Sequence, residues 1–459
     1  MAVWSEVSIS ELEGHFRLEA EFYQPRFLKD KSDILECGLP VKRLGDLCEK
    51  VTDGSHQTPD YQEEGVPFIM VRDVDEGTVN FNASKFITPE FDSSLRHCKP
   101  VSGDILLTKV GSIGKAVVVP QNAPSFNIFV SLAVLKNVLG VNSYYLTTFL
   151  NSHYGKSQSF RQAKGVSQLD LHLQEIREFL IPIPSTSFQE EIADLCRQSQ
   201  QKRGDSQLLY AQAEATLLEA LGLDAPAVSD KIGYERNFSQ VMRAQRFDAQ
   251  YFHPRNWELE KRLLAAPHKR LRQVATIYSG FAWKSEYFRE SSEDGEPFVR
   301  IRDCKPGQID TEGLSRLEAD YALACRLNGQ PISQAQRGDI IIGMDGVDYF
   351  YGGLVQSACY VNQRACRVAP FDSALPAEYL MVVINSTLGQ SQLLRRMTIA
   401  QTVGHITNED VRDLIIPTSD DLVEEVARKV RDSFQAKTDA QTLLEEAKTR
   451  VEALIAEGA

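Results

Sequence analysis

Three features are missing from this 459-residue sequence, and each absence excludes a class of protein. The eight cysteines contain no CxxC pair, no spacing suited to a metal and no dense framework, which argues against disulfide scaffolds and zinc sites. No apolar run approaches the roughly 18 residues needed to cross a bilayer. The first residues, MAVWSEVS, lack the basic flank and apolar core of a signal peptide. We therefore expect a soluble, reduced, cytoplasmic protein.

The sequence also lacks an excess of positive charge. Its formal net charge of −13 argues at first against nucleic acid, whose binding proteins usually carry a basic surface. Counted by segment, the charge is −5 for residues 1–185, −4 for 186–224, 0 for 225–419 and −4 for 420–459. The two short segments thus hold eight of the thirteen excess charges. We expect these acidic segments to face partner proteins, which leaves room for a basic groove elsewhere.

A coherent catalytic set is absent as well. The turn GSIGKA at Gly111 is close to a nucleotide-binding P-loop, but Lys109 stands where the first glycine belongs and Ala116 where the magnesium-binding hydroxyl belongs. The glycines instead indicate either a close backbone approach to a ligand or DNA phosphate, or a plain hairpin.

Other enzyme signatures are equally incomplete. There is no glycine-rich cofactor loop with the polar-Pro-Pro-aromatic site that a DNA methyltransferase needs. Glu446 and Lys448 form the one Glu-x-Lys pair, and its place on the C-terminal segment indicates a solvated helix face rather than a nuclease site. His97 beside Cys98 indicates ordinary packing, because no further ligand stands at metal spacing. These absences predict a binding subunit that is not an enzyme and holds no metal.

What the chain does contain is an internal repeat. RLEAEFYQPR from Arg17 returns without a gap as RFDAQYFHPR from Arg246, an offset of 229 residues. Further pairs follow in the same order: GVPFIMVRDVDEG from Gly65 with GEPFVRIRDCKPG from Gly295, SGDILL from Ser102 with RGDIII from Arg337, and YLTTFLNSHYGKSQ from Tyr145 with YLMVVINSTLGQSQ from Tyr379. A period this long predicts a duplicated domain rather than a solenoid.

Each half predicts a mixed α/β domain followed by a helix. Short Val- and Ile-rich runs at 67–71, 104–108, 115–119, 297–301, 339–343 and 353–361 indicate strands. Apolar spacing of three and four indicates helices over 144–160 and 377–396. We expect domains at 1–185 and 225–419, helical arms at 186–224 and 420–459, and a linker at 222–229.

The two arms have imperfect apolar seams. The C-terminal arm has a heptad pattern from Val423 to Leu454 with a polar interruption near Ser433 and Lys437, and the first arm is polar from Ser199 to Ser206. We expect the arms to pair with each other. Their shared apolar contact is predicted to contain Leu208, Leu209, Leu217, Leu444, Val451 and Leu454.

Three loops differ between the otherwise similar halves. VTDGSHQTPDY from Val51 corresponds to YSGFAWKSEYF from Tyr278, TKVGSIGK to GMDGVDYFYGG, and RQAKGVSQLD from Arg161 to RMTIAQTVGH from Arg396. A common scaffold with different loops is expected if the two copies read different ligands. Neutral drift at exposed loops is the alternative.

Together these motifs resemble the specificity subunit of type I restriction-modification systems. The resemblance is carried by PFIMVRDV and PFVRIRDC, GDILLTKVGSIG and GDIIIGMDG, the NS pairs at Asn151 and Asn385, and the IP endings at Ile181 and Ile416, each followed by a helix. The second half departs from the pattern because it lacks the GSIG form, and its segment HITNED at His405 aligns loosely with DLHLQE at Asp170.

This resemblance implies two target recognition domains that each read one half of a split DNA sequence, separated by two long antiparallel coiled-coil helices. It also implies docking of two methyltransferase subunits that bind S-adenosylmethionine, and of ATP-dependent restriction or translocase subunits, with no cofactor in this chain. A protein-interaction adaptor with duplicated peptide-binding domains is the alternative. A divergent nucleotide hydrolase using the Gly111 turn is a second one.

Under the DNA-binding interpretation, candidate contacts come from the dissimilar loops, where cations suit phosphates and polar or aromatic side chains suit bases. In the first domain they are His56, Gln57, Lys109, Ser112, Lys115, Lys164 and Gln168, and in the second Trp283, Lys284, Tyr349, Tyr351, Arg395 and Arg396.

Overall fold

Strands and helices alternate through both halves of the chain. The computed structural model describes residues 4–9, 12, 17–81, 85–165, 168–223, 233–330, 332, 334–400 and 403–458. Most of the linker expected at 222–229 lies outside these ranges. The chain divides into two units: unit 1 contains residues 1–204 and 437–459, and unit 2 contains residues 205–436. Each unit therefore combines one predicted domain with part of each predicted arm.

Unit 1 is built on a four-stranded antiparallel sheet with the order β2-β10-β7-β8. Smaller sheets are β1-β11, β6-β3-β9 and β4-β5. Its strands are β1 (Val41–Arg43), β2 (Cys48–Asp53), β3 (Val66–Ile69), β4 (Val74–Asp75), β5 (Thr78–Val79), β6 (Lys85–Ile87), β7 (Ile105–Thr108), β8 (Ala116–Val118), β9 (Asn127–Ile128), β10 (Leu132–Val138) and β11 (Leu180–Pro182). Its helices include α1 (Pro25–Glu36), α2 (Pro89–Ser94), α3 (Ser143–Asn151), α4 (His153–Gln162) and α5 (Leu173–Arg177).

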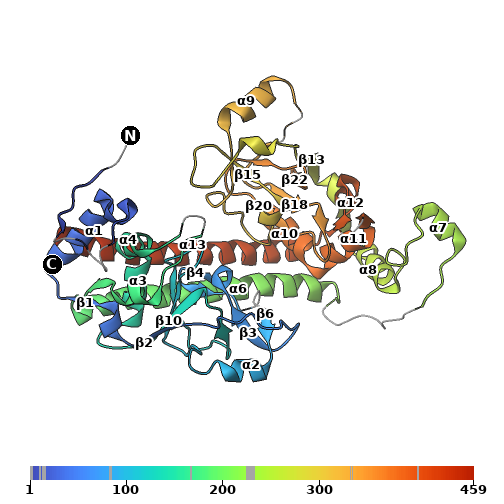
Figure 1. Ribbon diagram of the computed structural model, residues 1–459. Helices are drawn as coiled ribbons and strands as arrows, with labels where there is room; N and C mark the ends of the chain where they lie inside the picture. Colours follow the sequence, from blue (N-terminus) through green and yellow to red (C-terminus); the bar gives the residue numbers. More distant parts are fainter. Residues whose placement is uncertain are drawn as a thin grey trace. The chain divides into compact units, whose positions relative to one another are not determined.

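Unit 2 has a central sheet of the corresponding order, β13-β22-β18-β20, which Figure 1 labels. Smaller sheets are β12-β25, β14-β16-β15-β21-β17 and β19-β24-β23. The strands are β12 (His268–Arg270), β13 (Ala275–Ser279), β14 (Phe288–Arg289), β15 (Glu296–Val299), β16 (Arg316–Leu317), β17 (Gln334–Ala335), β18 (Ile340–Gly343), β19 (Asp345–Gly346), β20 (Gly352–Leu354), β21 (Cys359–Val361), β22 (Ala365–Pro370), β23 (Thr398–Ala400), β24 (Val403–His405) and β25 (Ile415–Pro417). The helices include α7 (Phe238–Ala244), α8 (Pro254–Ala265), α9 (Ala319–Leu327), α10 (Ala377–Asn385), α11 (Thr387–Arg396) and α12 (Asn408–Arg412). The mixed α/β content predicted from the sequence is confirmed.

Three predicted elements are divided in the structure. The helices expected over 144–160 and 377–396 each break at a serine, Ser152 or Ser386, which has extended backbone angles and ends one helix as the next begins. The strand expected over 353–361 becomes β20 and β21, joined through a bend at Gln356 and Ser357. The spacing of apolar residues does not reveal these breaks, because the residues before and after each break are both largely buried.

The repeated arginine motif anchors the start of each half to the end of a helix. In unit 1, Arg17 Nη1 donates to the Gln162 carbonyl at 3.2 Å, and Arg161 Nε donates to the Phe22 carbonyl at 3.0 Å. In unit 2, Arg246 Nη1 donates to the Arg396 carbonyl at 2.6 Å and Arg395 Nε to that of Tyr251 at 2.9 Å. The repeat thus preserves a structural contact.

The tyrosines and asparagines of the repeat have equally matched partners. The Tyr145 hydroxyl donates to the Pro182 carbonyl at 2.7 Å, and that of Tyr379 to Pro417 at 2.9 Å. Asn151 accepts a hydrogen bond from Ala116 N and donates one to Ala116 O, at 2.7 and 2.8 Å. Asn385 binds both backbone groups of Gly352 in the same way, at 2.8 Å each. These contacts join α3 to β8 in unit 1 and α10 to β20 in unit 2.

Two long helices, α6 (Thr186–Ala220) and α13 (Asp420–Glu457), contribute to the core of each unit. In unit 1, Ile192 and Cys196 share a buried cluster with Ala447 and Val451. In unit 2, Ala213 and Leu217 share another with Val423, Val426 and Val430.

Buried serines account for the polar interruptions seen in both seams. Ser199 Oγ donates to the Ala440 carbonyl, and Ser433 Oγ donates to the Ser206 carbonyl, each at 2.7 Å. The prediction that Leu208 is part of the shared apolar contact is wrong, since its side chain is 57% exposed. Tyr210, two residues later on the same helix, packs against the core of unit 2.

Two further features of the structure concern the cysteine thiols and the hydrophobicity of the helices. All eight cysteines are free thiols, seven of them buried. Burial raises the pKa of Cys48, Cys359 and Cys366 to about 12. Among the described helices, none is both long and apolar enough to cross a membrane.

Candidate nucleic-acid interface

Three of the dissimilar loops meet in unit 1, and we call residues 53–57, 109–112, 164–165 and 168–172 the unit 1 loop cluster. Gly111 N donates to the Leu169 carbonyl at 2.9 Å, and Leu171 N donates to that of Lys109 at 2.8 Å. Lys164 and Asp170 exchange a pair of backbone hydrogen bonds, both 2.8 Å long. The loop after β7 is therefore fixed directly to the loop after α4.

A buried ammonium group joins the same loops from within. Lys109 Nζ lies 3.6 Å from Asp53 Oδ2 and 3.6 Å from Asp170 Oδ1, and its side chain is 7% exposed. A cation between two carboxylates compensates their desolvation and holds their loops together. Lys109 is thus an internal bridge in this structure, although the sequence suggested a phosphate contact.

Around this bridge, polar side chains point into solvent. His56 is 74% exposed and lies 3.3 Å from Asp53, while Gln57, Ser112, Lys164 and Gln168 are also exposed. The Lys164 ammonium lies 2.6 Å from a Glu175 oxygen, and the lysine side chain of this pair is 43% exposed. Five predicted residues therefore share one surface that offers hydrogen-bond donors and a cation, the groups that suit base edges and phosphates.

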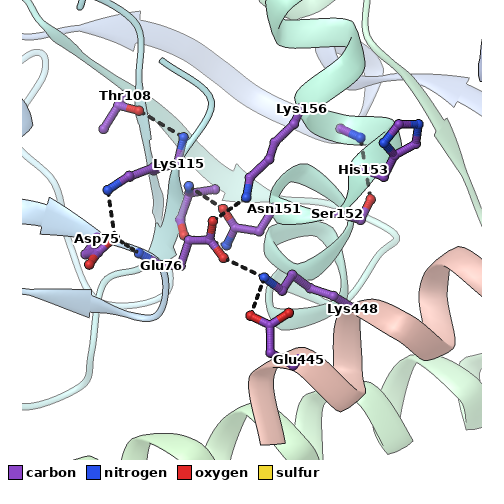
Figure 2. A network of polar contacts seen from close by, with 12 residues as sticks. Asp75, Glu76, Thr108, Lys115, Asn151, Ser152, His153, Lys156, Glu445 and Lys448 are labelled. Carbon is purple, nitrogen blue, oxygen red and sulfur yellow. Dashed lines mark hydrogen bonds and ion pairs between the residues drawn. The ribbon is translucent and has the colours of Figure 1, made fainter. Parts of the chain in front are cut away.

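Lys115 has a different environment. Its Nζ lies 2.9 Å from Asp75 Oδ1, and its backbone N–H donates to Thr108 Oγ1 at 2.9 Å. Figure 2 shows Lys115 directed toward Asp75, beside the ion pairs of Glu76 with Lys156 and Lys448. The structure assigns Lys115 to this network and does not join it to Lys109.

The corresponding loops of unit 2 also meet, and we call residues 279–284, 344–351, 398–400 and 403–408 the unit 2 loop cluster. β19 pairs with β24, and Ile406 N donates to the Met344 carbonyl at 3.0 Å. His405 Nδ1 lies 2.6 Å from Asp345 Oδ1, and Asn408 Nδ2 donates to Ser279 Oγ at 2.7 Å. The two clusters thus use different side chains to join equivalent loops.

The unit 2 candidates divide by exposure. Lys284 is 68% exposed, 4.0 Å from Glu286. Tyr349 is 56% exposed, and its ring stacks on Tyr351 with centroids 5.0 Å apart and 7° between planes. The indole of Trp283 is 5% exposed, is surrounded by aromatic side chains and donates Nε1 to the Val361 carbonyl at 3.1 Å.

Two arginine candidates lie inside the fold. Arg395 is 6% exposed, pairs with Glu260 and lies over the Tyr251 ring, 4.4 Å from its centroid. Burial lowers the pKa of Arg396, which sits at the end of α11. Neither guanidinium is presented to a ligand on the surface.

Sequence reasoning missed the residues that join the loops. These are Asp53 and Asp170 in unit 1, and Asp345, Arg364 and His405 in unit 2. Arg364 is 60% exposed, lies 2.8 Å from Asp345 and adds a cation to the unit 2 cluster. Asp53 and His405 are the last residues of β2 and β24, and Arg364 lies in the turn after β21, but no local signal in the sequence shows which loops these residues join.

Comparison with known proteins finds similarity over part of the chain. Residues 38–200 match the family described as type I restriction modification DNA specificity domain. The type I restriction enzyme EcoBI specificity subunit of Escherichia coli is 28% identical over 142 residues, which cover 30% of this chain and 29% of that protein. The match therefore spans less than a third of the relative's length.

Three solved structures also resemble the chain. The S subunit of a type I restriction-modification system from M. genitalium is 12% identical with a TM-score of 0.39, over 91% of this chain and 95% of that one. The HsdS subunit from Thermoanaerobacter tengcongensis is 15% identical with a TM-score of 0.28, over 92% and 97%. The type IIG restriction endonuclease BpuSI is 10% identical with a TM-score of 0.33, over 53% and 38%.

Proposed function

We propose that the whole chain is the DNA-reading subunit of a restriction-modification complex, starting from the match of residues 38–200 to the family described as type I restriction modification DNA specificity domain. Each loop cluster would read one half of a bipartite DNA target. The observation that carries the proposal is the pair of central sheets with corresponding strand order, each bearing loops of different composition. A shared scaffold with different exposed side chains is what two different half-sites require.

Within the clusters, exposure separates two roles. We assign DNA contacts to the exposed side chains of His56, Gln57, Ser112, Lys164 and Gln168 in unit 1 and of Lys284 and Tyr349 in unit 2, and to the half-buried Tyr351 that stacks on Tyr349. Lys109, Trp283 and Arg395 are buried, Lys115 is 39% exposed but paired with Asp75, and burial lowers the pKa of Arg396, so we assign these five residues positioning roles.

The long helices would set the distance between half-sites. Contacts of Ser199 with Ala440 and of Lys202 with Asp439 in unit 1 are those of antiparallel neighbours. Contacts of Ser206 with Ser433 and of Thr216 with Lys429 in unit 2 have the same sense. A helix of 35 residues is roughly 50 Å long at ~1.5 Å per residue, somewhat more than one ~34 Å turn of DNA.

The chemistry would belong to partner subunits. Two methyltransferase subunits would dock on the helices and bind S-adenosylmethionine, and ATP-dependent restriction or translocase subunits would complete the complex. This chain would contribute recognition and no covalent step. A duplicated protein-interaction adaptor is the alternative, and an electrophoretic shift on duplex DNA with the methyltransferase present separates the two.

A domain exchange tests the proposal. Residues 225–419 are replaced by the corresponding segment of a relative, and methylated motifs are mapped in cells that carry the methyltransferase. We expect one half of the motif to change and the other to persist. The reciprocal exchange of residues 1–185 should change the other half, and a change of both halves in either chimera would contradict separate reading.

A further inference from the structure

The site beside Asn151 in unit 1 and the equivalent site beside Asn385 in unit 2 differ in how much empty volume they contain. In unit 1, the space beside Asn151 and Lys448 is closed to about 30 Å³. In unit 2, the place beside Asn385 and Glu214 is an open cleft of about 670 Å³. Asn151 and Asn385 mark the equivalence, because each binds both backbone groups of the adjacent strand. Lys448 and Glu214 are separated by the same 234-residue offset as these two asparagines.

A turn of the chain itself fills the place in unit 1. Glu76, at the tip between β4 and β5, lies 2.5 Å from Lys156 Nζ and 3.0 Å from Lys448 Nζ (Figure 2). Arg203 Nη2 donates to the Glu76 carbonyl at 3.1 Å. Gly77 follows with φ of +72°, and a Cβ there would lie 2.9 Å from Leu444, so the tip fits closely against α13. The occupant of this site is thus an acidic turn held by basic side chains.

Unit 2 has lost both the acidic turn and the cations that hold it. The sequence RDVDEG of the turn corresponds to RDCKPG, which places Pro306 at the position of Glu76. Lys156 and Lys448 correspond to Gln390 and Glu214, and Pro306, Gln390 and Glu214 all line the cleft. The wall that faces the turn has therefore changed from basic to acidic.

The cleft lining is suited to a cation. It contains the carboxylates of Glu214 and Asp348, one guanidinium, that of Arg255, and the rings of Tyr210, Tyr349 and Tyr351. Aromatic faces attract ammonium and guanidinium groups, most strongly where water is excluded. Within the described part of the chain, no cation lies within ion-pair distance of Glu214, and its burial raises its pKa although the Thr387 N–H opposes this effect.

We propose that this cleft of unit 2 binds a turn of a partner protein that carries a lysine or arginine side chain. The basic side chain would lie against Glu214, as Glu76 lies against Lys448 in unit 1, and the ring of Tyr210 would pack against its alkyl stem. A peptide turn is the favoured occupant because a peptide turn fills the equivalent place in unit 1. Phosphates are disfavoured because the two carboxylates outnumber the single guanidinium in the lining.

Calorimetric titration of the full chain with two peptides tests this inference. Both are capped variants of the unit 1 tip at residues 74–78, in which asparagine replaces Asp75, and their sequences are Val-Asn-Lys-Gly-Thr and Val-Asn-Glu-Gly-Thr. We expect the lysine peptide to bind at least tenfold more tightly than the glutamate peptide. Equal binding of the two, or binding of neither at millimolar concentration, would overturn the proposal.

Three variants locate the binding. Glu214→Gln should weaken the lysine peptide at least tenfold, while Glu219→Gln, an exposed carboxylate on the same helix, should leave it unchanged. Glu214→Lys places the unit 1 residue in unit 2, so it should reverse the preference toward the glutamate peptide. Circular dichroism checks that each variant is folded. An unchanged preference in Glu214→Lys would place the peptide elsewhere and contradict the proposal.

Two further measurements distinguish a protein turn in the unit 2 cleft from a small cation, and this inference from the proposed DNA reading. Spermidine that binds as tightly as the lysine peptide and displaces it would show a site for small cations, which overturns a protein turn as the occupant. The inference does not rest on DNA reading, because peptide binding is measured without DNA. A chain that binds DNA but neither peptide contradicts this inference alone.

Discussion

At the scale of single residues, burial separates the residues that were predicted to contact DNA into those open to solvent and those enclosed by the protein. Lys109 and Lys164 stand in neighbouring loops of unit 1, yet the Lys109 side chain is 7% exposed and that of Lys164 is 43% exposed. Sequence identifies both as loop cations but contains no signal for the carboxylates that enclose one of them. The distinction depends on loops far apart in sequence, and these meet only in the fold.

Lys164→Ala should therefore lower the slope of log affinity against log salt by about 0.9 for duplex DNA, the value of one lost phosphate contact. Fluorescence anisotropy in the assembled complex at several salt concentrations measures the slope. Lys29→Ala, an exposed lysine on α1, is the matched control and should leave it unaltered. An unaltered slope in Lys164→Ala would move the phosphate contacts away from this loop.

Asn151 makes a stability prediction at the same scale. Its amide satisfies the N–H and the carbonyl of Ala116, and its side chain is buried. Asn151→Ala leaves both backbone groups without a partner, and each such buried group costs about 1–3 kcal/mol. Urea denaturation should show this loss for Asn151→Ala and almost none for the exposed Asn122→Ala. Equal stability of the two variants would show that water replaces the amide.

At the scale of elements, the sequence predicts which segments are strands and helices better than it predicts where they end. The runs at Ile105–Thr108 and Ile340–Gly343 are strands as expected, because a Val- and Ile-rich run is buried on both faces. The breaks at Ser152 and Ser386 were missed, since a serine is also tolerated within a helix. The partners of the loops could not be predicted, because they depend on tertiary contacts such as that of Lys109 with Asp53.

The β4–β5 hairpin gives an element-scale prediction with a defined pH dependence. Burial tends to raise the pKa of Glu76, but the hydrogen bonds and charges of Lys156 and Lys448 outweigh it, so the pKa is lowered from 4.5. The stabilisation is therefore present above 4.5 and is lost as the pH falls from there through the lowered pKa of the folded state. Asp75, Arg203, Lys115 and Glu445 are the other charged groups beside this contact.

Glu76→Gln should accordingly lower the melting temperature at neutral pH and flatten its decline on acidification. The melting curves of the variant and the parent chain should converge at low pH, where Glu76 is protonated in both states. Glu63→Gln, an exposed carboxylate outside this contact, should follow the parent chain throughout. A constant difference at every pH would mean that the lost contact is steric rather than ionic.

At the scale of the whole molecule, α6 and α13 each contribute residues to both units. In the proposed function, the lengths of these helices set the distance between the two half-sites. α6 crosses the unit boundary at Gly204 and α13 crosses it at Ala436. The buried Ser199 and Ser433 lie close to these crossings, and each donates to a carbonyl of the opposite helix. Such paired polar contacts oppose a slip of one helix along the other, because a slip would leave buried hydroxyls without partners.

Inserting four residues after Lys437 should therefore alter the spacing between the two halves of the methylated motif. Four helical residues add roughly 6 Å at ~1.5 Å per residue, or nearly two base pairs at ~3.4 Å each. Motif mapping in cells should then find both half-sites with a longer or altered spacer, or no methylation where the partner subunits cannot adapt. Four residues inserted after the exposed Asn122 should leave the spacer as it was, since no long helix is lengthened. A fully active complex with the original spacer after the Lys437 insertion would show that the helices do not measure the gap.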